Sequence, residues 1–116
     1  MSELTNARVV VVVFAMKGCG ACEEYAPRFE RYVDHFRTNG VPFVWNTMKP
    51  APGQIPVLLL DAASPDESIQ AFADKLKISA TPTTCVMTKF NTTKVEGALP
   101  NDEIHRILDH AMTMNR

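Results

Sequence analysis

The chain has 116 residues, of which 46% are hydrophobic and 22% charged, a composition that suits one globular domain over residues 1–116. Its net charge of −1 provides no basic field for a nucleic acid or an anionic membrane surface, so we expect neither as a partner. No apolar run approaches the roughly 18 residues of a membrane span. The three cysteines, an odd number, argue against a secreted disulfide framework and favour a reducing compartment.

The stretch from Val9 to Val33 combines a strand, a cysteine pair and a helix. Five valines and Phe14 form an apolar, β-branched run typical of a buried, central parallel strand. After the cysteines, apolar residues at spacings of three and four predict a helix with one face turned to a core. That face holds Cys22, Tyr25, Ala26, Phe29, Tyr32, Val33 and Phe36.

Arg8 and the apolar run imitate a secretory signal, but removing that run would delete the central strand. We therefore expect the protein to stay in the cytoplasm.

The middle of the chain predicts an edge strand, a loop and a second buried strand. The Asn-Gly pair at residues 39–40 tolerates the left-handed conformation that ends a helix. The apolar segment 41–45 contains Pro42, which is tolerated in an edge strand but not in a central one. Proline and glycine make residues 49–53 a loop, and residues 55–60 form another apolar run.

The second half of the chain predicts helices alternating with strands. Ser64 is expected as an N-cap, with Pro65 as the first residue of the helix that follows. The later elements are a strand, a hairpin turn, a return strand and a helix, expected at residues 83–88, 90–93, 94–98 and from 100 onward. This order predicts an α/β fold with a central mixed sheet flanked by helices.

The two cysteines at the start of the first predicted helix carry the chemistry. The first N–H groups of a helix lack intrahelical partners, and the helix dipole puts positive potential there, which stabilises a thiolate. Disulfide exchange needs an attacking thiolate and a second thiol that resolves the mixed disulfide. Because Cys19 would lie exposed at the helix tip and Cys22 one turn inward, we assign Cys19 as nucleophile and Cys22 as resolving thiol. Gly20 allows a substrate disulfide to approach the attacking sulfur closely.

The setting of the cysteine pair disfavours two other interpretations. A Cys-x-x-Cys is half of a zinc site, but no second pair exists and the three histidines fit the polar faces of helices, so no metal site is expected. The pair could also occur by chance without chemistry, although its position between a buried strand and an amphipathic helix argues against that. Cys85 lies in an apolar run and is expected to fill the core.

These features together resemble the thioredoxin family over most of the chain. The specific elements are Cys19-Gly20-Ala21-Cys22, Pro27 inside the helix, Thr81-Pro82-Thr83 and the glycine-containing segment 95–99. The resemblance implies a thioredoxin-like fold. It also implies that Thr81 and Pro82 form a loop beside the cysteine pair, where the backbone of Thr81 would hydrogen-bond to a bound peptide. The sequence alone does not reveal the isomer of the Thr81-Pro82 bond.

The sequence departs from the family's pattern around the cysteine pair and at its start. Gly18 stands where a substrate-facing tryptophan is usual, and Ala21 replaces a proline. Val13 occupies the strand position of a buried aspartate that helps to deprotonate the resolving thiol. The family usually has a strand and a helix before the central strand, but only eight residues precede it here. We therefore expect a truncated N-terminus, with residues 41–45 filling the vacant edge of the sheet.

Charges near the helix tip act in opposite directions on the first cysteine. Glu23 replaces a common lysine, and together with Glu24 it disfavours a thiolate at Cys19. Lys17 and the helix dipole favour that thiolate by an effect of similar size, on the order of 1 kcal/mol for the dipole. The net sign does not follow from the sequence.

The resemblance implies a thiol–disulfide oxidoreductase that cycles between a Cys19–Cys22 disulfide and a dithiol. Protein disulfides are the expected substrates, and a reductase or a small thiol the expected electron source, with no bound cofactor. The residues expected to contact substrate are Gly18, Gly20, Ala21, Thr81 and Pro82.

A glutaredoxin-like, glutathione-dependent reductase is one alternative, ranked lower because the usual proline-aromatic pair between the cysteines is absent. The other is a binding or scaffold protein with little turnover, in which the losses at positions 18 and 13 would be tolerated.

Overall fold

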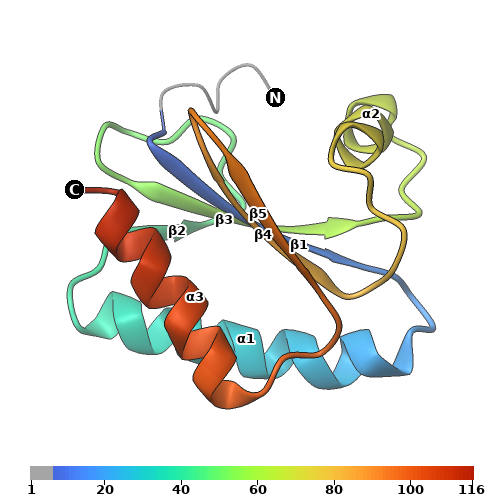
Figure 1. Cartoon of the computed structure of the whole chain (residues 1–116), viewed down its shortest axis with the longest axis horizontal. Coiled ribbons are helices and arrows are strands. Elements are labelled where there is room, and N and C mark those ends of the chain that lie inside the picture. The colour runs from blue at the N-terminus through green and yellow to red at the C-terminus, as the bar shows by residue number, and fades with distance from the viewer. Residues whose placement is uncertain (1–6) are drawn as a thin grey trace.

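The computed structural model describes residues 7–116 (Figure 1). Most of the segment in which a truncated N-terminus was expected, residues 1–6, lies outside this described part. The elements in chain order are β1 (Val9–Ala15), α1 (Gly20–Thr38), β2 (Phe43–Trp45), β3 (Ile55–Asp61), α2 (Glu67–Lys75), β4 (Thr83–Thr88), β5 (Thr92–Glu96) and α3 (Asn101–Met114). They confirm the α/β class with a central mixed sheet flanked by helices. No helix within residues 7–116 is long and apolar enough to cross a membrane.

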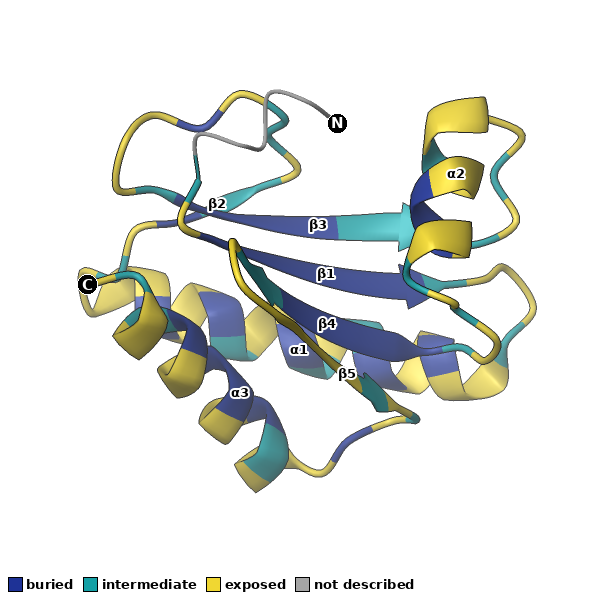
Figure 2. Ribbon diagram, turned by 45° about the horizontal axis from the view of Figure 1, so that its top comes forward, coloured by how far each residue is buried: buried dark blue, intermediate teal, exposed yellow. Residues whose placement is uncertain are grey.

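The sheet has the strand order β2-β3-β1-β4-β5, which places β1 at its centre (Figure 2). Val11 of β1 is paired with Val57 of the parallel strand β3 and with Val86 of the antiparallel strand β4. The central position of β1 is therefore confirmed. Its expected parallel character holds on one side only, because the chain returns antiparallel from β4 onward.

The short strand β2 fills one edge of the sheet, where it pairs parallel to β3. This confirms the expected edge strand, although it begins only at Phe43. Pro42 has no N–H to donate, but its carbonyl accepts a hydrogen bond from the Ile55 N–H at 2.9 Å. The strand ends at Trp45, and the next residue, Asn46, has a φ of 49°. The side-chain oxygen of Asn46 accepts a hydrogen bond from the Leu59 N–H at 3.0 Å.

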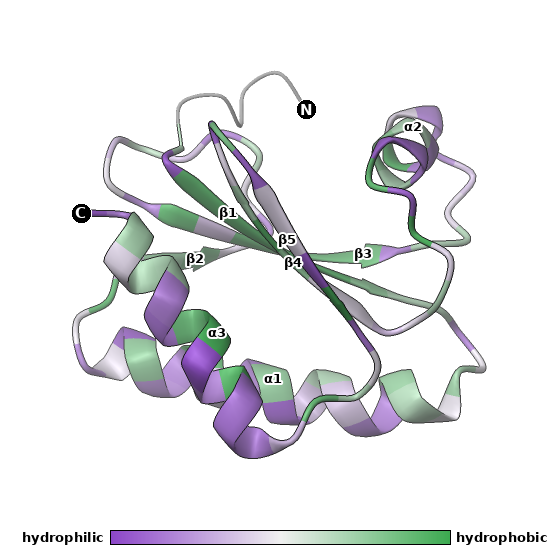
Figure 3. Ribbon diagram, in the orientation of Figure 1, coloured by the Kyte–Doolittle hydropathy of each residue, from purple (hydrophilic) through white to green (hydrophobic). Residues whose placement is uncertain are grey.

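Helices cover both faces of the sheet and create two core clusters (Figure 1). The larger cluster, under α1 and α3, includes Val9, Val11, Val13, Phe29, Val33, Ile104 and Leu108. The smaller cluster, under α2, includes Val10, Val12, Phe14, Leu58, Phe72 and Cys85. Successive side chains of a strand point to opposite faces, so a strand covered on both sides needs a continuous apolar run. Figure 3 shows this contrast between the uniformly hydrophobic β1 and the two-sided helices α1 and α3.

Two further element boundaries differ from those expected from the sequence. The N-cap of α2 is Asp66, whose carboxylate accepts a hydrogen bond from the Ser68 N–H at 2.8 Å. Ser64, the expected cap, instead accepts a hydrogen bond from the Asp66 N–H at 3.2 Å and closes a turn before the helix. The return strand β5 begins at Thr92, two residues earlier than expected, because the hairpin turn is tighter than the sequence suggested.

Candidate active site

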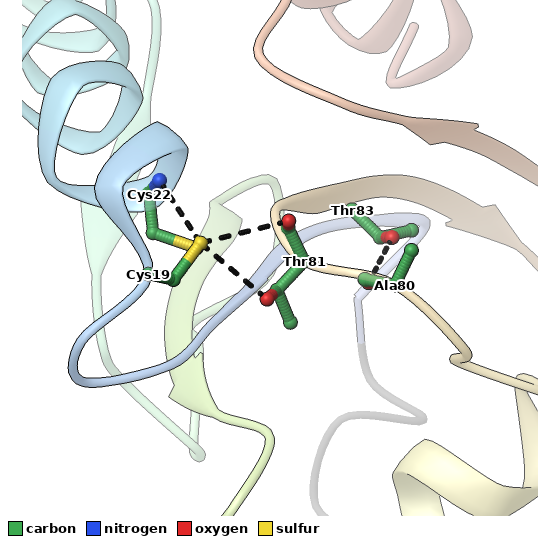
Figure 4. Close-up of a disulfide and its surroundings, with 5 residues drawn as sticks. All are labelled: Cys19, Cys22, Ala80, Thr81 and Thr83. Atoms are coloured by element: carbon green, nitrogen blue, oxygen red, sulfur yellow. Dashed lines mark hydrogen bonds between the residues drawn. A yellow bond between two sulfur atoms is a disulfide. The ribbon is translucent and has the colours of Figure 1, made fainter.

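Cys19 and Cys22 are joined by a disulfide at the N-terminus of α1 (Figure 4). Their Cα atoms lie 5.2 Å apart, within the usual range for a disulfide. Cys19 is the N-cap residue, and its sulfur accepts a hydrogen bond from the Cys22 N–H at 3.2 Å. Cys19 is half-buried, whereas Cys22 is only 3% exposed. One sulfur is therefore accessible from solvent and the other faces the core.

The loop before β4 supplies the second wall of the site. The Thr81-Pro82 peptide bond is cis. The carbonyl oxygen and the hydroxyl oxygen of Thr81 each lie 3.6 Å from Cys19 Sγ (Figure 4). A sulfur in a disulfide carries no hydrogen, so in this state the Thr81 hydroxyl donates the hydrogen bond. Pro82 is buried and lies directly before β4 in the chain.

A tight turn carries the chain from β1 to the helix tip. The Cys19 N–H donates a hydrogen bond to the Met16 carbonyl at 3.3 Å, and Gly18 within the turn has a φ of +81°. Such a φ strains residues that carry a Cβ, which explains a glycine at this position. Gly18, Gly20 and Ala21 are all exposed beside Cys19. Of the expected substrate-contacting residues, Thr81 thus contacts the Cys19 sulfur, the other three named here are exposed close to Cys19 in the chain, and Pro82 is buried.

The acidic residues at the helix tip are not equivalent. Glu24 accepts hydrogen bonds from the Arg28 guanidinium at 2.6 and 3.0 Å. These bonds hold the pKa of the Glu24 carboxyl below its usual value. Glu23 forms no ion pair with another described residue. Arg28 therefore compensates the charge of Glu24, whereas the charge of Glu23 has no such partner among the described residues.

A buried hydroxyl pair was missed by the sequence reasoning. Tyr25, one helical turn after Cys22, is fully buried, and its hydroxyl lies 2.8 Å from the hydroxyl oxygen of Thr84 in β4. Burial raises the pKa of Tyr25. Val13, which occupies the position of the family's buried aspartate, is the residue of β1 that pairs with Thr84. The only available signals were a tyrosine on the core face and a threonine within an apolar strand.

The third cysteine lies away from the disulfide. Cys85 is fully buried in the smaller cluster, which confirms its expected place in the core. Burial raises the pKa of its thiol to about 11, so it stays protonated at neutral pH. Within residues 7–116, no group of three or more His, Cys, Asp or Glu side chains is placed to hold a metal ion.

The fold and the disulfide-capable cysteine pair together define, at the level of a family, a thiol–disulfide oxidoreductase. A family model described as a thioredoxin-like domain matches residues 2–112. The chain therefore belongs to the thioredoxin-like family, as the sequence resemblance predicted. No curated protein sequence matches the chain significantly.

Thioredoxins are also among the solved structures that share this fold. Chloroplastic thioredoxin z is 19% identical with a TM-score of 0.63, and the match covers 97% of this chain and 85% of that one. A thioredoxin of Malassezia sympodialis is 19% identical with a TM-score of 0.65, covering 96% and 82% respectively. Oxidised thioredoxin of Plasmodium falciparum is 18% identical with a TM-score of 0.64, covering 95% and 88%. At these identities the likeness shows a shared fold.

Proposed function

We propose that the protein is a thiol–disulfide oxidoreductase acting on protein disulfides, with Cys19 as nucleophile and Cys22 as resolving thiol. The observation that carries this proposal is the pairing of a half-buried sulfur with a buried one at the tip of α1. Disulfide exchange requires that one sulfur meets the substrate and that the second reaches only the first. This difference in exposure matches that division of roles.

In the first step, the Cys19 thiolate attacks one sulfur of a substrate disulfide. A bond forms between Cys19 and that sulfur, the substrate disulfide breaks, and the other substrate sulfur leaves as a thiolate that takes a proton from solvent. The Cys22 N–H, 3.2 Å from Cys19 Sγ, and the Thr81 hydroxyl, 3.6 Å from it, are placed to donate hydrogen bonds to the attacking thiolate. Such bonds favour the charged form of the thiol.

In the second step, Cys22 resolves the mixed disulfide. It loses its proton and attacks Cys19 Sγ, so that the Cys19–Cys22 disulfide forms while the remaining substrate sulfur leaves as a thiol. Two electrons have then passed from the protein's dithiol to the substrate. The disulfide in the structure corresponds to the end of this half-reaction. A reductase or a small thiol would restore the dithiol, and the protein would need no bound cofactor for these steps.

The substrate side of the proposal rests on the surroundings of Cys19. Gly18, Gly20 and Ala21 leave the sulfur open on one side, and the Thr81-Pro82 loop flanks it on the other. An extended peptide suits such a shallow site better than a small molecule does. We also infer a reducing compartment, the cytoplasm, because the odd cysteine number of the chain does not suit a disulfide framework.

Turnover with dithiothreitol and a protein disulfide tests the proposal. The wild type should reduce the substrate catalytically, and Cys19→Ser should reduce it no faster than dithiothreitol alone. Cys22→Ser, reduced first and then mixed with the substrate after dithiothreitol has been removed, should still attack and should accumulate a mixed disulfide on a non-reducing gel. Mass spectrometry after mild oxidation should find a two-hydrogen loss that links positions 19 and 22.

Two outcomes would replace this proposal. Equal activity of wild type and Cys19→Ser would favour a binding or scaffold protein. Turnover that depends on glutathione, with glutathione mixed disulfides as the preferred substrates, would favour the glutaredoxin-like alternative.

A further inference from the structure

A shallow groove lies between the C-terminal end of α2 and the β4–β5 hairpin, away from the disulfide. Its volume is about 440 Å³. Met87 lines this groove and also packs against the core cluster under α2, so the groove opens on the side of the sheet that α2 covers. We call it the lysine groove and define it by six of its lining residues, Lys75, Lys77, Met87, Lys89, Phe90 and Lys94.

The lysine groove concentrates positive charge. Four of the chain's six lysines line it, and none of its lining residues is acidic, although the whole chain has a net charge of −1. The Lys94 ammonium donates hydrogen bonds to the carbonyls of Leu76 and Lys77, at 3.3 and 2.9 Å, and thereby satisfies the C-terminus of α2. Lys75, Lys77 and Lys89 are exposed, and no ion pair between described residues includes them. Their charges remain available to an external anion.

An apolar contact point stands beside these charges. Phe90 lies in the hairpin turn with 92% of its surface exposed, far more than any other large hydrophobic residue of the described chain. The next most exposed, Met16 and Met114, are each 41% exposed. An aromatic ring that contributes nothing to the core but lies among cationic side chains is typical of a contact residue in a protein interface.

We propose that the lysine groove docks an acidic polypeptide segment of a partner protein, with an apolar side chain of that segment packed on Phe90. Exposed charges act over roughly a Debye length, about 8 Å at physiological salt, so a short acidic segment meets mainly the local positive field. A long polyanion would also meet the net negative charge of the rest of the chain. The groove also has one aromatic ring, whereas sequence-independent binding of single-stranded nucleic acid uses several for stacking.

The disulfide and the hairpin end of the groove lie near opposite ends of β4. This strand runs from Thr83, directly after Pro82, to Thr88 at the groove. With a rise of about 3.3 Å per residue, the two ends of β4 are roughly 17 Å apart. A docked segment would leave Cys19 uncovered, so the protein could hold a partner at the groove while the sulfur reacts.

A labelled peptide binding measurement tests the proposal directly. The probe is a fluorescein-labelled glutamate-rich peptide with one central tryptophan, and the matched peptide has glutamine in place of every glutamate. Fluorescence anisotropy should show saturable binding that is at least about tenfold weaker for the glutamine peptide and weakens similarly at high salt. In amide NMR spectra, the shifted resonances should belong to residues 75–77 and 87–92.

Matched variants localise the effect and separate it from redox activity. Lys89→Glu should weaken binding of the glutamate peptide about tenfold, and Lys49→Glu, the same charge change at an exposed lysine outside the groove, should leave it unchanged. Phe90→Ser should weaken both peptides, because both carry tryptophan. None of these variants should alter reduction of a protein disulfide with dithiothreitol.

The proposal is overturned if binding is not saturable, or if Lys49→Glu weakens it as much as Lys89→Glu does. It is also overturned if a single-stranded oligonucleotide or a vesicle of anionic phospholipid binds more tightly than the glutamate peptide. Cys19→Ser should lose disulfide reduction but should bind the glutamate peptide as the wild type does, because docking at the groove needs no redox chemistry.

Discussion

At the scale of single residues, the hydroxyl pair of Tyr25 and Thr84 is the notable polar feature of the core. It lies one helical turn below Cys22 and beside Val13 in the sheet register. Each hydroxyl is the hydrogen-bond partner of the other in a part of the core that is buried from water. Removing one partner leaves the other buried without a hydrogen bond, which costs about 1–3 kcal/mol.

We therefore expect Tyr25→Phe and Thr84→Val each to lower the free energy of unfolding of the oxidised protein by about 1–3 kcal/mol. The double variant should lose less than the sum, because no orphaned hydroxyl remains. Urea denaturation followed by circular dichroism measures all three values. Tyr32→Phe is the control: its hydroxyl has no hydrogen-bond partner among the described residues and it is only half-buried, so a loss below about 0.5 kcal/mol is expected. Additive losses in the double variant would contradict the coupling.

The Cys85 thiol gives a prediction about pH. Its pKa of about 11 is raised by burial, so the neutral thiol is the form that the native core favours. The resulting stability is fully present below the unfolded thiol pKa of about 8.5 and is lost as the pH rises toward 11. Iodoacetamide should leave Cys85 unmodified in the native protein at pH 8 and modify it after denaturation. Mass spectrometry of peptides containing residue 85 measures this, and rapid labelling of the native thiol would argue against its burial.

At the scale of elements, Asn46 determines how the edge strand β2 ends. Its φ of 49° suits asparagine or glycine, and its side chain replaces a backbone partner for the Leu59 N–H. Asn46→Gly removes the hydrogen bond alone, whereas Asn46→Ala removes it and also places at this φ a residue that tolerates the left-handed region less well than asparagine does. We expect the free energy of unfolding of Asn46→Ala, measured by urea denaturation, to be about 1–2 kcal/mol lower than that of Asn46→Gly.

Asn39→Ala is the matched control for that comparison. Asn39 also uses its side chain, which donates a hydrogen bond to the His35 carbonyl at 2.8 Å, but its φ is −91°. Asn39→Ala should lose only this hydrogen bond, which lowers the free energy of unfolding by about 0.5–1.5 kcal/mol. It should be at least as stable as Asn39→Gly. If Asn46→Ala proved as stable as Asn46→Gly, the backbone argument for β2 would be wrong.

Periodic patterns predicted most elements, and contacts distant in sequence were the part that escaped prediction. The strand over residues 83–88 and the end of the first helix before Asn39 agree with the structure, because local composition determines both. The cap of α2 was misplaced, since Ser64 and Asp66 are both good caps and only the three-dimensional turn decides between them. The Tyr25–Thr84 bond joins residues 59 positions apart, which no local pattern reveals.

The cysteine pair was predictable because its motif is short and its setting is local. A strand that enters a helix through two cysteines places both sulfurs near a helix N-terminus whatever the rest of the chain does. The contact of Thr81 with Cys19 spans 62 positions and followed only from the resemblance to a family. The lysine groove, which joins α2 to a hairpin, had no signature in the sequence.

At the scale of the whole molecule, the two sides of the sheet are covered unequally. The cluster under α1 and α3 contains sixteen buried residues and the one under α2 contains seven. Local opening is easiest where few apolar contacts are lost. The α2 side should therefore open before the sheet unfolds as a whole.

Native-state hydrogen exchange should find a lower opening free energy for the amides of α2 than for those of β1. Helix α3 is the internal control, because its four buried residues pack into the larger cluster. Its amides should stay protected under conditions in which those of α2 exchange. Equal opening free energies for α2 and β1 would mean that the molecule opens as one cooperative unit.

The placement of β1 has a consequence during synthesis on the ribosome. Both neighbouring strands come later in the chain. The two pairing partners of Val11, which are Val57 and Val86, are therefore synthesised after it. Until then, a run of five valines has only the emerging helix α1 to shelter it, and uncharged β-branched runs associate readily with one another. The yield of folded protein in a cell should therefore depend on how quickly translation reaches β3 and on chaperones that shield nascent chains.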